Sequence, residues 1–198
     1  QDSAIVPTTA PNSPVIGGAF VVNTLTVEVG KTATINGSLT TTTFLNSGIV
    51  NGIGTLIMSG VTNVNNGTIS VADPRTVSGG FRRLGGTGSI ISNFTINGGL
   101  LELSSDHQFS TISGTGGQLD IRSFSLRVNG AGNPINNTGG VFCLGGCHIE
   151  FNGTSAQTIG SLATGFLTIN NPAGVTLSIS LTITESLTLT SGLVNTGA

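Results

Sequence analysis

The sequence has no tryptophan, no tyrosine and few charged residues of either sign. Aspartate, glutamate, lysine and arginine together make up 7% of its 198 residues, and the formal net charge is −2. The chain lacks the cluster of lysines and arginines that binds nucleic acid or an anionic lipid surface. It also has no uninterrupted apolar run of about 18 residues, which a membrane-spanning helix requires. We therefore expect neither nucleic-acid binding nor membrane insertion.

Small polar residues make up the bulk of the chain instead. Glycine (31), threonine (29), serine (21) and asparagine (18) account for half of the residues, and 37% of residues are hydrophobic. This hydrophobic fraction argues against disorder, because disordered chains lack the apolar residues that a core needs. The composition is typical of a soluble, β-rich protein.

The local pattern is that of β-strands. Apolar residues alternate with threonine in 181–184 and 187–190, which places leucine and isoleucine on one face of each strand. Five other segments alternate in the same way: 25–29, 68–71, 118–122, 125–128 and 148–151. Asn-Gly pairs such as Asn36-Gly37 separate these runs and suit corners, because both residues tolerate positive φ. No segment has helical periodicity, so the sequence predicts an all-β fold.

Recurring phrases indicate which all-β fold this is. LNSGIVN at 45–51 resembles LTSGLVN at 189–195, and INGSL at 35–39 resembles INGGL at 96–100. Such recurrence is typical of a solenoid, in which each coil stacks its short strands on the previous coil. We predict a parallel β-helix of roughly 20-residue coils, about nine or ten in number. A β-sandwich also uses short alternating strands, but it gives no reason for phrases to recur.

Two segments depart from the coil pattern. Residues 1–18 contain three of the six prolines and predict an extended N-terminal arm that precedes a solenoid over 19–198. Gln1 follows no hydrophobic leader in this sequence, so we expect a mature chain whose signal peptide has been removed. Residues 73–88 contain three of the six basic residues and predict a loop that leaves the solenoid wall.

The two cysteines, Cys143 and Cys147, lie four positions apart and are joined through Gly-Gly. This spacing makes a local disulfide sterically plausible, which indicates an oxidising, extracellular setting. His148 is adjacent, but no fourth ligand lies near in sequence, so a metal site is not expected. We expect no metal and no cofactor.

The sequence also predicts which side chains fill the interior. Leucine, isoleucine, valine and phenylalanine should stack inward, with threonine, serine and asparagine outward and Asn/Gly at the corners. The large fillers are seven phenylalanines: Phe44, Phe94, Phe109, Phe124, Phe142, Phe151 and Phe166.

An enzymatic alternative depends on the acidic residues, because polysaccharide-cleaving β-helices need paired carboxylates to give and take a proton. Glu102, Asp120 and Glu150 stack if the coils align, and Arg122 can join them. Each occupies an alternate strand position, so we interpret them as exposed, solubilising charges and the protein as a non-enzyme. Asp106-His107 is a loop dyad with no identifiable nucleophile beside it.

A further alternative is ice binding, which requires Thr-x-Thr pairs on successive coils of one flat face. The chain has four such pairs, at 24/26, 32/34, 182/184 and 188/190. The last two pairs begin six residues apart, which is too close for one coil. We interpret these threonines as ordinary outward strand residues.

Three phrases carry a resemblance to a known class of proteins. Residues 153–160, 166–177 and 187–197 resemble the repeats of adhesin-like β-solenoids on the surface of Bacteroidota, which are often exported by the type IX route. Residues 19–149 resemble autotransporter passenger repeats in style. The resemblance implies a secreted, surface-associated protein with a structural or adhesive role. Asp2-Ser3-Ala4 also fits the short O-glycosylation motif of that phylum, with Ser3 as the acceptor.

The two ends of the predicted solenoid suggest a mode of assembly. After Glu185 the sequence has strong β-propensity without charge or proline, so the last coil lacks the usual protection of an edge. Either the chain is a piece of a longer solenoid, or the last coil of each copy is completed by the next copy, head to tail. We hypothesise the second, a head-to-tail homopolymer that forms an extracellular filament or surface fibre, with surface glycans or host and abiotic surfaces as further partners. The expected interface residues are Val15, Ile16, Phe20, Val21, Val22, Leu187, Leu189, Leu193 and Val194.

Overall fold

The fold was examined in a computed structural model, which describes residues 2–76, 81–114, 116–137, 140–143, 146–160 and 162–196. Within these ranges there are 22 strands and no helix. The described residues therefore contain no helical candidate for a membrane span. The strands form a parallel β-solenoid of about nine turns with about 19 residues per coil. The predicted fold class is thus confirmed.

The strands have the following bounds in chain order: β1 (Ser3–Val6), β2 (Val15–Ile16), β3 (Ala19–Val27), β4 (Thr32–Ile35), β5 (Ser38–Asn46), β6 (Ile49–Met58), β7 (Thr62–Asn65), β8 (Thr68–Thr76), β9 (Phe81–Gly85), β10 (Ser89–Ile96), β11 (Leu100–Leu103), β12 (His107–Gly114), β13 (Gln118–Asp120), β14 (Ser125–Val128), β15 (Ile135–Asn137), β16 (Val141–Phe142), β17 (His148–Phe151), β18 (Gln157–Ile159), β19 (Leu162–Asn170), β20 (Val175–Leu177), β21 (Leu181–Ser191) and β22 (Val194–Thr196).

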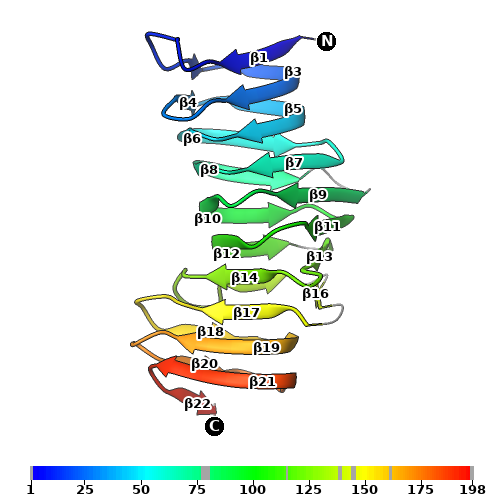
Figure 1. The fold of residues 1–198 in the computed structure, drawn as a ribbon, viewed down its shortest axis with the longest axis vertical. Coiled ribbons are helices and arrows are strands. Elements are labelled where there is room, and N and C mark those ends of the chain that lie inside the picture. Colours follow the sequence, from blue (N-terminus) through cyan, green and yellow to red (C-terminus); the bar gives the residue numbers. More distant parts are fainter. Residues whose placement is uncertain are drawn as a thin grey trace.

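The strand pairings arrange the coils into three faces. The coils stack along one axis, with the two termini at opposite ends (Figure 1). The first face includes β1, β7, β9, β11, β13 and β16, and the second includes β2, β4, β14 and β17. The third face includes β15. Long strands such as β3, β5, β6, β8, β10 and β12 turn a corner and serve two faces each. Near the C-terminal end, β18, β20 and β22 form a separate three-stranded sheet.

One column of inward side chains runs along the second face without a break. Each member is the register partner of the next, and successive members are separated along the axis by about one strand spacing, 4.8 Å. The first eight members are at most 1% exposed, whereas the ninth, Leu189, is 56% exposed. The column consists of Ala33, Val50, Ile69, Ile90, Phe109, Val128, Phe151, Ile169 and Leu189.

The phenylalanines only partly follow the predicted pattern. Phe44, Phe94, Phe109 and Phe151 are fully buried, and Phe94 and Phe109 meet edge to face with ring centroids 5.6 Å apart. The prediction is wrong for Phe166, which is 38% exposed because it occupies an outward position of β19, and Phe124 is only half-buried. The side chain of Phe142 lies outside the described residues.

Several asparagines point inward, which corrects the expectation that this residue type faces solvent. Asn46 and Asn65 are register partners at a corner and are both buried. The amide Nδ2 of Asn46 donates to Oδ1 of Asn65 at 2.8 Å, and Nδ2 of Asn65 donates to the carbonyl of Ser89 at 3.3 Å. The amides therefore satisfy backbone groups that a corner leaves unpaired in the interior.

Parts of the two segments predicted to leave the coils are paired with the coils. Within 1–18, β1 pairs with β3 and β2 pairs with β4, so this segment supplies strands of the first coil. Within 73–88, β8 continues to Thr76 and β9 begins at Phe81, and both are paired on the stack. Residues 77–80 lie outside the described residues. Backbone hydrogen bonding to the next coil outweighs the local proline and charge signals.

Candidate functional site

The C-terminal end of the solenoid exposes a hollow in the apolar interior. A cavity of about 460 Å³ opens there, and its apolar lining comes from β18 to β22 and the turns between them. Among the described residues, β21 pairs only with β19, and β22 pairs only with β20. The last coil therefore presents both strand edges and core side chains. The lining includes Ile159, Leu167, Leu177, Leu181, Ile183 and Leu187.

The register explains why these side chains are apolar although they are exposed. Leu187 is the partner of Leu167, which is 1% exposed, and Leu189 is the partner of Ile169, which is fully buried. Leu187 and Leu189 thus occupy core positions, yet they are 48% and 56% exposed. Within the described ranges no further strand is paired with β21 on that side, which accounts for their exposure.

The N-terminal end has a different shape. Val6 in the first strand is buried, with 4% of its side chain exposed. Phe20 is the partner of Leu39, a core residue that is 1% exposed, but the Phe20 side chain is 55% exposed. One end of the stack therefore offers a hollow, and the other end offers an aromatic side chain.

The structure separates the predicted interface residues into two groups. Ile16, Phe20, Val22, Leu187, Leu189 and Val194 occupy inward register positions of the two end coils. Val15 and Val21 point outward, because their partners Thr34 and Thr40 alternate with buried residues, and Leu193 lies in a turn. Ile183 and Leu177 line the cavity but were not predicted, although Ile183 has the same strand parity as Leu187 in the sequence.

A second arrangement on the first face joins two buried carboxylates to two arginines. Glu102 and Asp120 are register partners on β11 and β13, and each is 4% exposed. Arg83 Nε donates to Glu102 at 2.7 Å, and Arg122 Nε lies 2.9 Å from Glu102 and 3.1 Å from Asp120. The interpretation of these carboxylates as exposed charges is therefore wrong. Glu150 lies on another face, where it pairs with Arg127 at 3.2 Å.

The local backbone holds Arg122 in place. Its φ of 56° lies in the left-handed region, and it is the only residue other than glycine with a positive φ in the described part of the chain. The Arg122 amide donates to Asp120 Oδ1 at 2.9 Å, which fixes this turn. The sequence analysis named Arg122 as able to join the stacked carboxylates. It assigned Arg83 to a loop, so the ion pair between Arg83 and Glu102 was missed.

Glu102 is held ionised by its arginine partners. Burial alone raises the pKa of this carboxyl, but hydrogen bonds from Arg122 and Arg83 and the charges of both lower the pKa below its usual value. Glu102 is therefore a poor proton donor at neutral pH. Acid–base hydrolysis requires one group of a carboxylate pair to be protonated. The ion-pair geometry favours a structural role for this cluster.

We expect Glu102→Gln to lower stability by about 1–2 kcal/mol at pH 7, because charged hydrogen bonds are lost while half-exposed arginines remain screened by water. Because the pKa of Glu102 is lower in the folded state, its ionised form stabilises the fold at any pH above the ordinary glutamate pKa. This stabilisation is lost as the pH falls through the pKa of the folded state. The difference from the parent chain should therefore shrink below about pH 4. Urea unfolding at pH 7 and pH 3 measures this stability difference, and Glu185→Gln is the control because Glu185 is exposed. An equal loss at both pH values would contradict the ion-pair assignment.

The Asp106-His107 dyad does not assemble a catalytic triad. Asp106 Oδ1 accepts from the backbone amide of Ser125 at 2.8 Å, and the His107 ring is buried beside Phe109. Burial lowers the pKa of His107, and smaller, opposing effects come from hydrogen bonds of the ring to the backbone of Ser105 and Asp106 and from the Asp106 charge. Ser105 Oγ lies 3.3 Å from His107 Nδ1, but His107 Nε2 has no hydrogen-bond partner in the described structure and therefore no orienting group.

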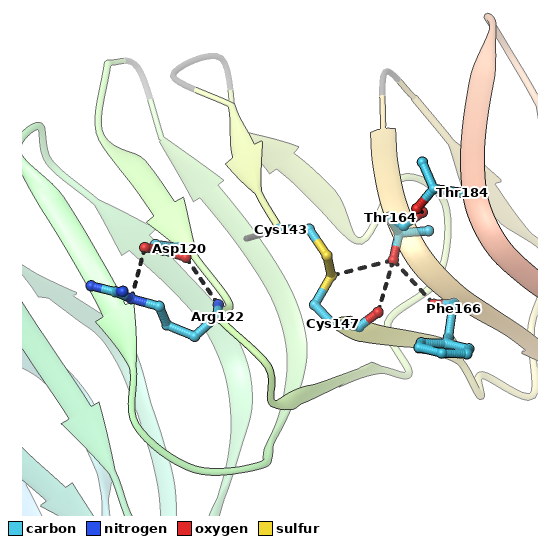
Figure 2. Close-up of a disulfide and its surroundings, with 7 residues drawn as sticks. All are labelled: Asp120, Arg122, Cys143, Cys147, Thr164, Phe166 and Thr184. Carbon is cyan, nitrogen blue, oxygen red and sulfur yellow. Dashed lines mark hydrogen bonds and ion pairs between the residues drawn. A yellow bond between two sulfur atoms is a disulfide. The ribbon is translucent and has the colours of Figure 1, made fainter. Parts of the chain in front are cut away.

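A disulfide joins Cys143 to Cys147, with their Cα atoms 5.5 Å apart (Figure 2). It connects the end of β16 to the start of β17. Thr164 from the next coil lies against it, with Oγ1 3.4 Å from Cys147 Sγ and donating to the Phe166 carbonyl at 3.0 Å. The bond therefore fixes one corner of the stack and its contact with the following coil.

The threonine pairs do not form one continuous array. Thr24 and Thr26 have Thr43 and Leu45 as neighbours on the next coil, so the pattern stops there. The pairs at 182/184 and 188/190 lie on the two halves of β21, which turns a corner between them.

Ser3, the predicted glycosylation acceptor, is exposed in β1. In the described part of the chain no three His, Cys, Asp or Glu residues are grouped as metal ligands.

Comparisons of the chain with protein-family models, with curated proteins and with solved structures found no match.

Proposed function

We propose that the chain is an extracellular structural protein, a subunit of a filament or surface fibre that assembles head to tail through its solenoid ends. The observation that carries the proposal is the inward column of the second face. Exposure along it rises from at most 1% to 56% in one step, from Ile169, which lines the end cavity, to its register partner Leu189. A further coil in the same register would bury this side chain.

The occupant we propose is the first coil of a second copy. All strands of the solenoid are parallel, so a copy displaced along the axis would bring β1, β2 and β3 alongside β21 and β22 with matching chain direction. Both ends have unpaired strand edges, which are templates for another strand. The contact joins two different surfaces and does not close on itself, so it generates a filament.

The extracellular and adhesive parts of the proposal have separate support. The disulfide favours an oxidising compartment, and the repeat phrases resemble surface adhesins. The outward rows of threonine, serine and asparagine suit hydrogen bonding to surface glycans or to host and abiotic surfaces. Such a fibre needs neither a catalytic group nor a cofactor, so we propose that the protein is not an enzyme.

The chain is expected to form elongated particles whose mass increases with protein concentration. Light scattering and electron microscopy of the full chain measure this, and Leu189→Asp should abolish it, because a carboxylate would be buried without a partner. Ile53→Asp is the matched control, since Ile53 is 81% exposed and lies on β6, which is paired with strands on both sides. A chain that stays monomeric at every concentration would contradict the proposal.

A further inference from the structure

The end cavity requires an apolar group from its partner, and the described N-terminal coil presents one large candidate. Phe20 is at the outer end of an inward column of the third face, where it is followed by Leu39 and Leu56, both at most 1% exposed. Its ring therefore belongs to the core by register but is 55% exposed. The neighbouring Val21 points outward and does not belong to an inward column.

We propose that the Phe20 ring of one copy inserts into the end cavity of the next copy. This inference rests on the proposed head-to-tail assembly and names the side chain that specifies it. The cavity of about 460 Å³ is ample for a phenyl ring, because an apolar protein cavity of about 150 Å³ already holds benzene. Its lining is mostly leucine, isoleucine and valine, with Ser178, Ser180 and Thr196 beside them, so most of its surface matches an aromatic ring in polarity.

This insertion gives the filament a direction. The hollow is formed by β18 to β22 at one end, and Phe20 projects from β3 at the other end, so the two surfaces are complementary and unlike. A copy turned end for end would face a hollow with a hollow or a ring with a ring. Strand pairing alone would allow several registers, and the cavity favours those that place the Phe20 ring over it.

The absence of tryptophan and tyrosine provides a direct optical test. In Phe20→Trp the single indole should show emission shifted to shorter wavelength as concentration rises and the chain assembles. Ile53→Trp should assemble equally but keep the emission of a solvated indole. Phe20→Ala should raise the concentration needed for assembly about tenfold or more, because the burial of one aromatic side chain is lost.

A mixing experiment tests the pairing of the two surfaces. Phe20→Asp copies keep the cavity, and Leu189→Asp copies keep Phe20, so each variant should be monomeric alone, whereas a mixture should give 1:1 dimers and nothing longer. Circular dichroism must show that both variants remain folded, and Val21→Asp is the control that should still form filaments.

The outcomes separate this inference from the proposed function. If Phe20→Asp forms filaments like the parent chain while Leu189→Asp does not, the copies assemble but another segment occupies the cavity, and the insertion of Phe20 is overturned. If Val21→Asp blocks assembly as strongly as Phe20→Asp does, the specific role of the ring is overturned. A parent chain that never assembles overturns the proposed function itself.

Discussion

Replacement of Phe109 by alanine is expected to lower the free energy of unfolding by about 3–5 kcal/mol. Phe109 is 1% exposed and contacts Phe94 edge to face, and its register partners Ile90 and Val128 lie directly before and after it in the inward column. Because each coil contacts only its neighbours, the vacated space lies in the middle of the stack, where the flanking coils cannot collapse into it.

Urea unfolding followed by circular dichroism measures this loss, since the chain has no tryptophan or tyrosine for fluorescence. Phe166→Ala is the matched control, and because Phe166 is 38% exposed its loss should be clearly smaller. Equal losses for the two variants would contradict the inward register of β12.

Replacement of Gly67 by alanine is expected to cost about 1–3 kcal/mol through overpacking. Gly67 lies at the corner between β7 and β8, directly on the preceding coil, and an added Cβ would collide with the carbonyl oxygen of Gly48. Gly88 on the next coil stands in the same relation to Gly67. The contact is with backbone, so only displacement of a whole coil would relieve it.

Gly116→Ala provides the control for this prediction, because an added Cβ at Gly116 would meet nothing within 4 Å. Its effect on the unfolding free energy should stay within about 0.5 kcal/mol. Thermal unfolding of the two variants side by side measures the difference, and a Gly67→Ala chain as stable as the parent would refute the close stacking at this corner.

Local patterns in the sequence were sufficient for the fold class. Alternation of apolar residues with threonine has a period of two, and Asn-Gly pairs mark corners by their composition, so both can be recognised without knowledge of neighbouring coils. The repeated phrases then indicated the coil length. The cysteine spacing was equally local, and the structure contains the Cys143–Cys147 disulfide.

Features that depend on contacts between coils were not predicted correctly. Residues 1–18 and 73–88 carry local signals for an arm and a loop, yet their strands pair with segments about one coil away. Asn46 and Asn65 look like solvent-exposed corner residues, but each satisfies groups of the next coil. Phe166 looks like a core residue, but its strand parity points it outward.

The sequence by itself determined that the chain forms short alternating strands, Gly/Asn corners and a repeated coil, because these depend on residues close together in the chain. Only the tertiary structure decided which carboxylates meet arginines and which apolar side chains stay uncovered. Glu102 lies between Arg83 and Arg122, each about one coil away, and Leu189 occupies a core column in the last coil that the structure describes. Both outcomes depend on the register between coils, which is set by the packing of residues about 20 positions apart.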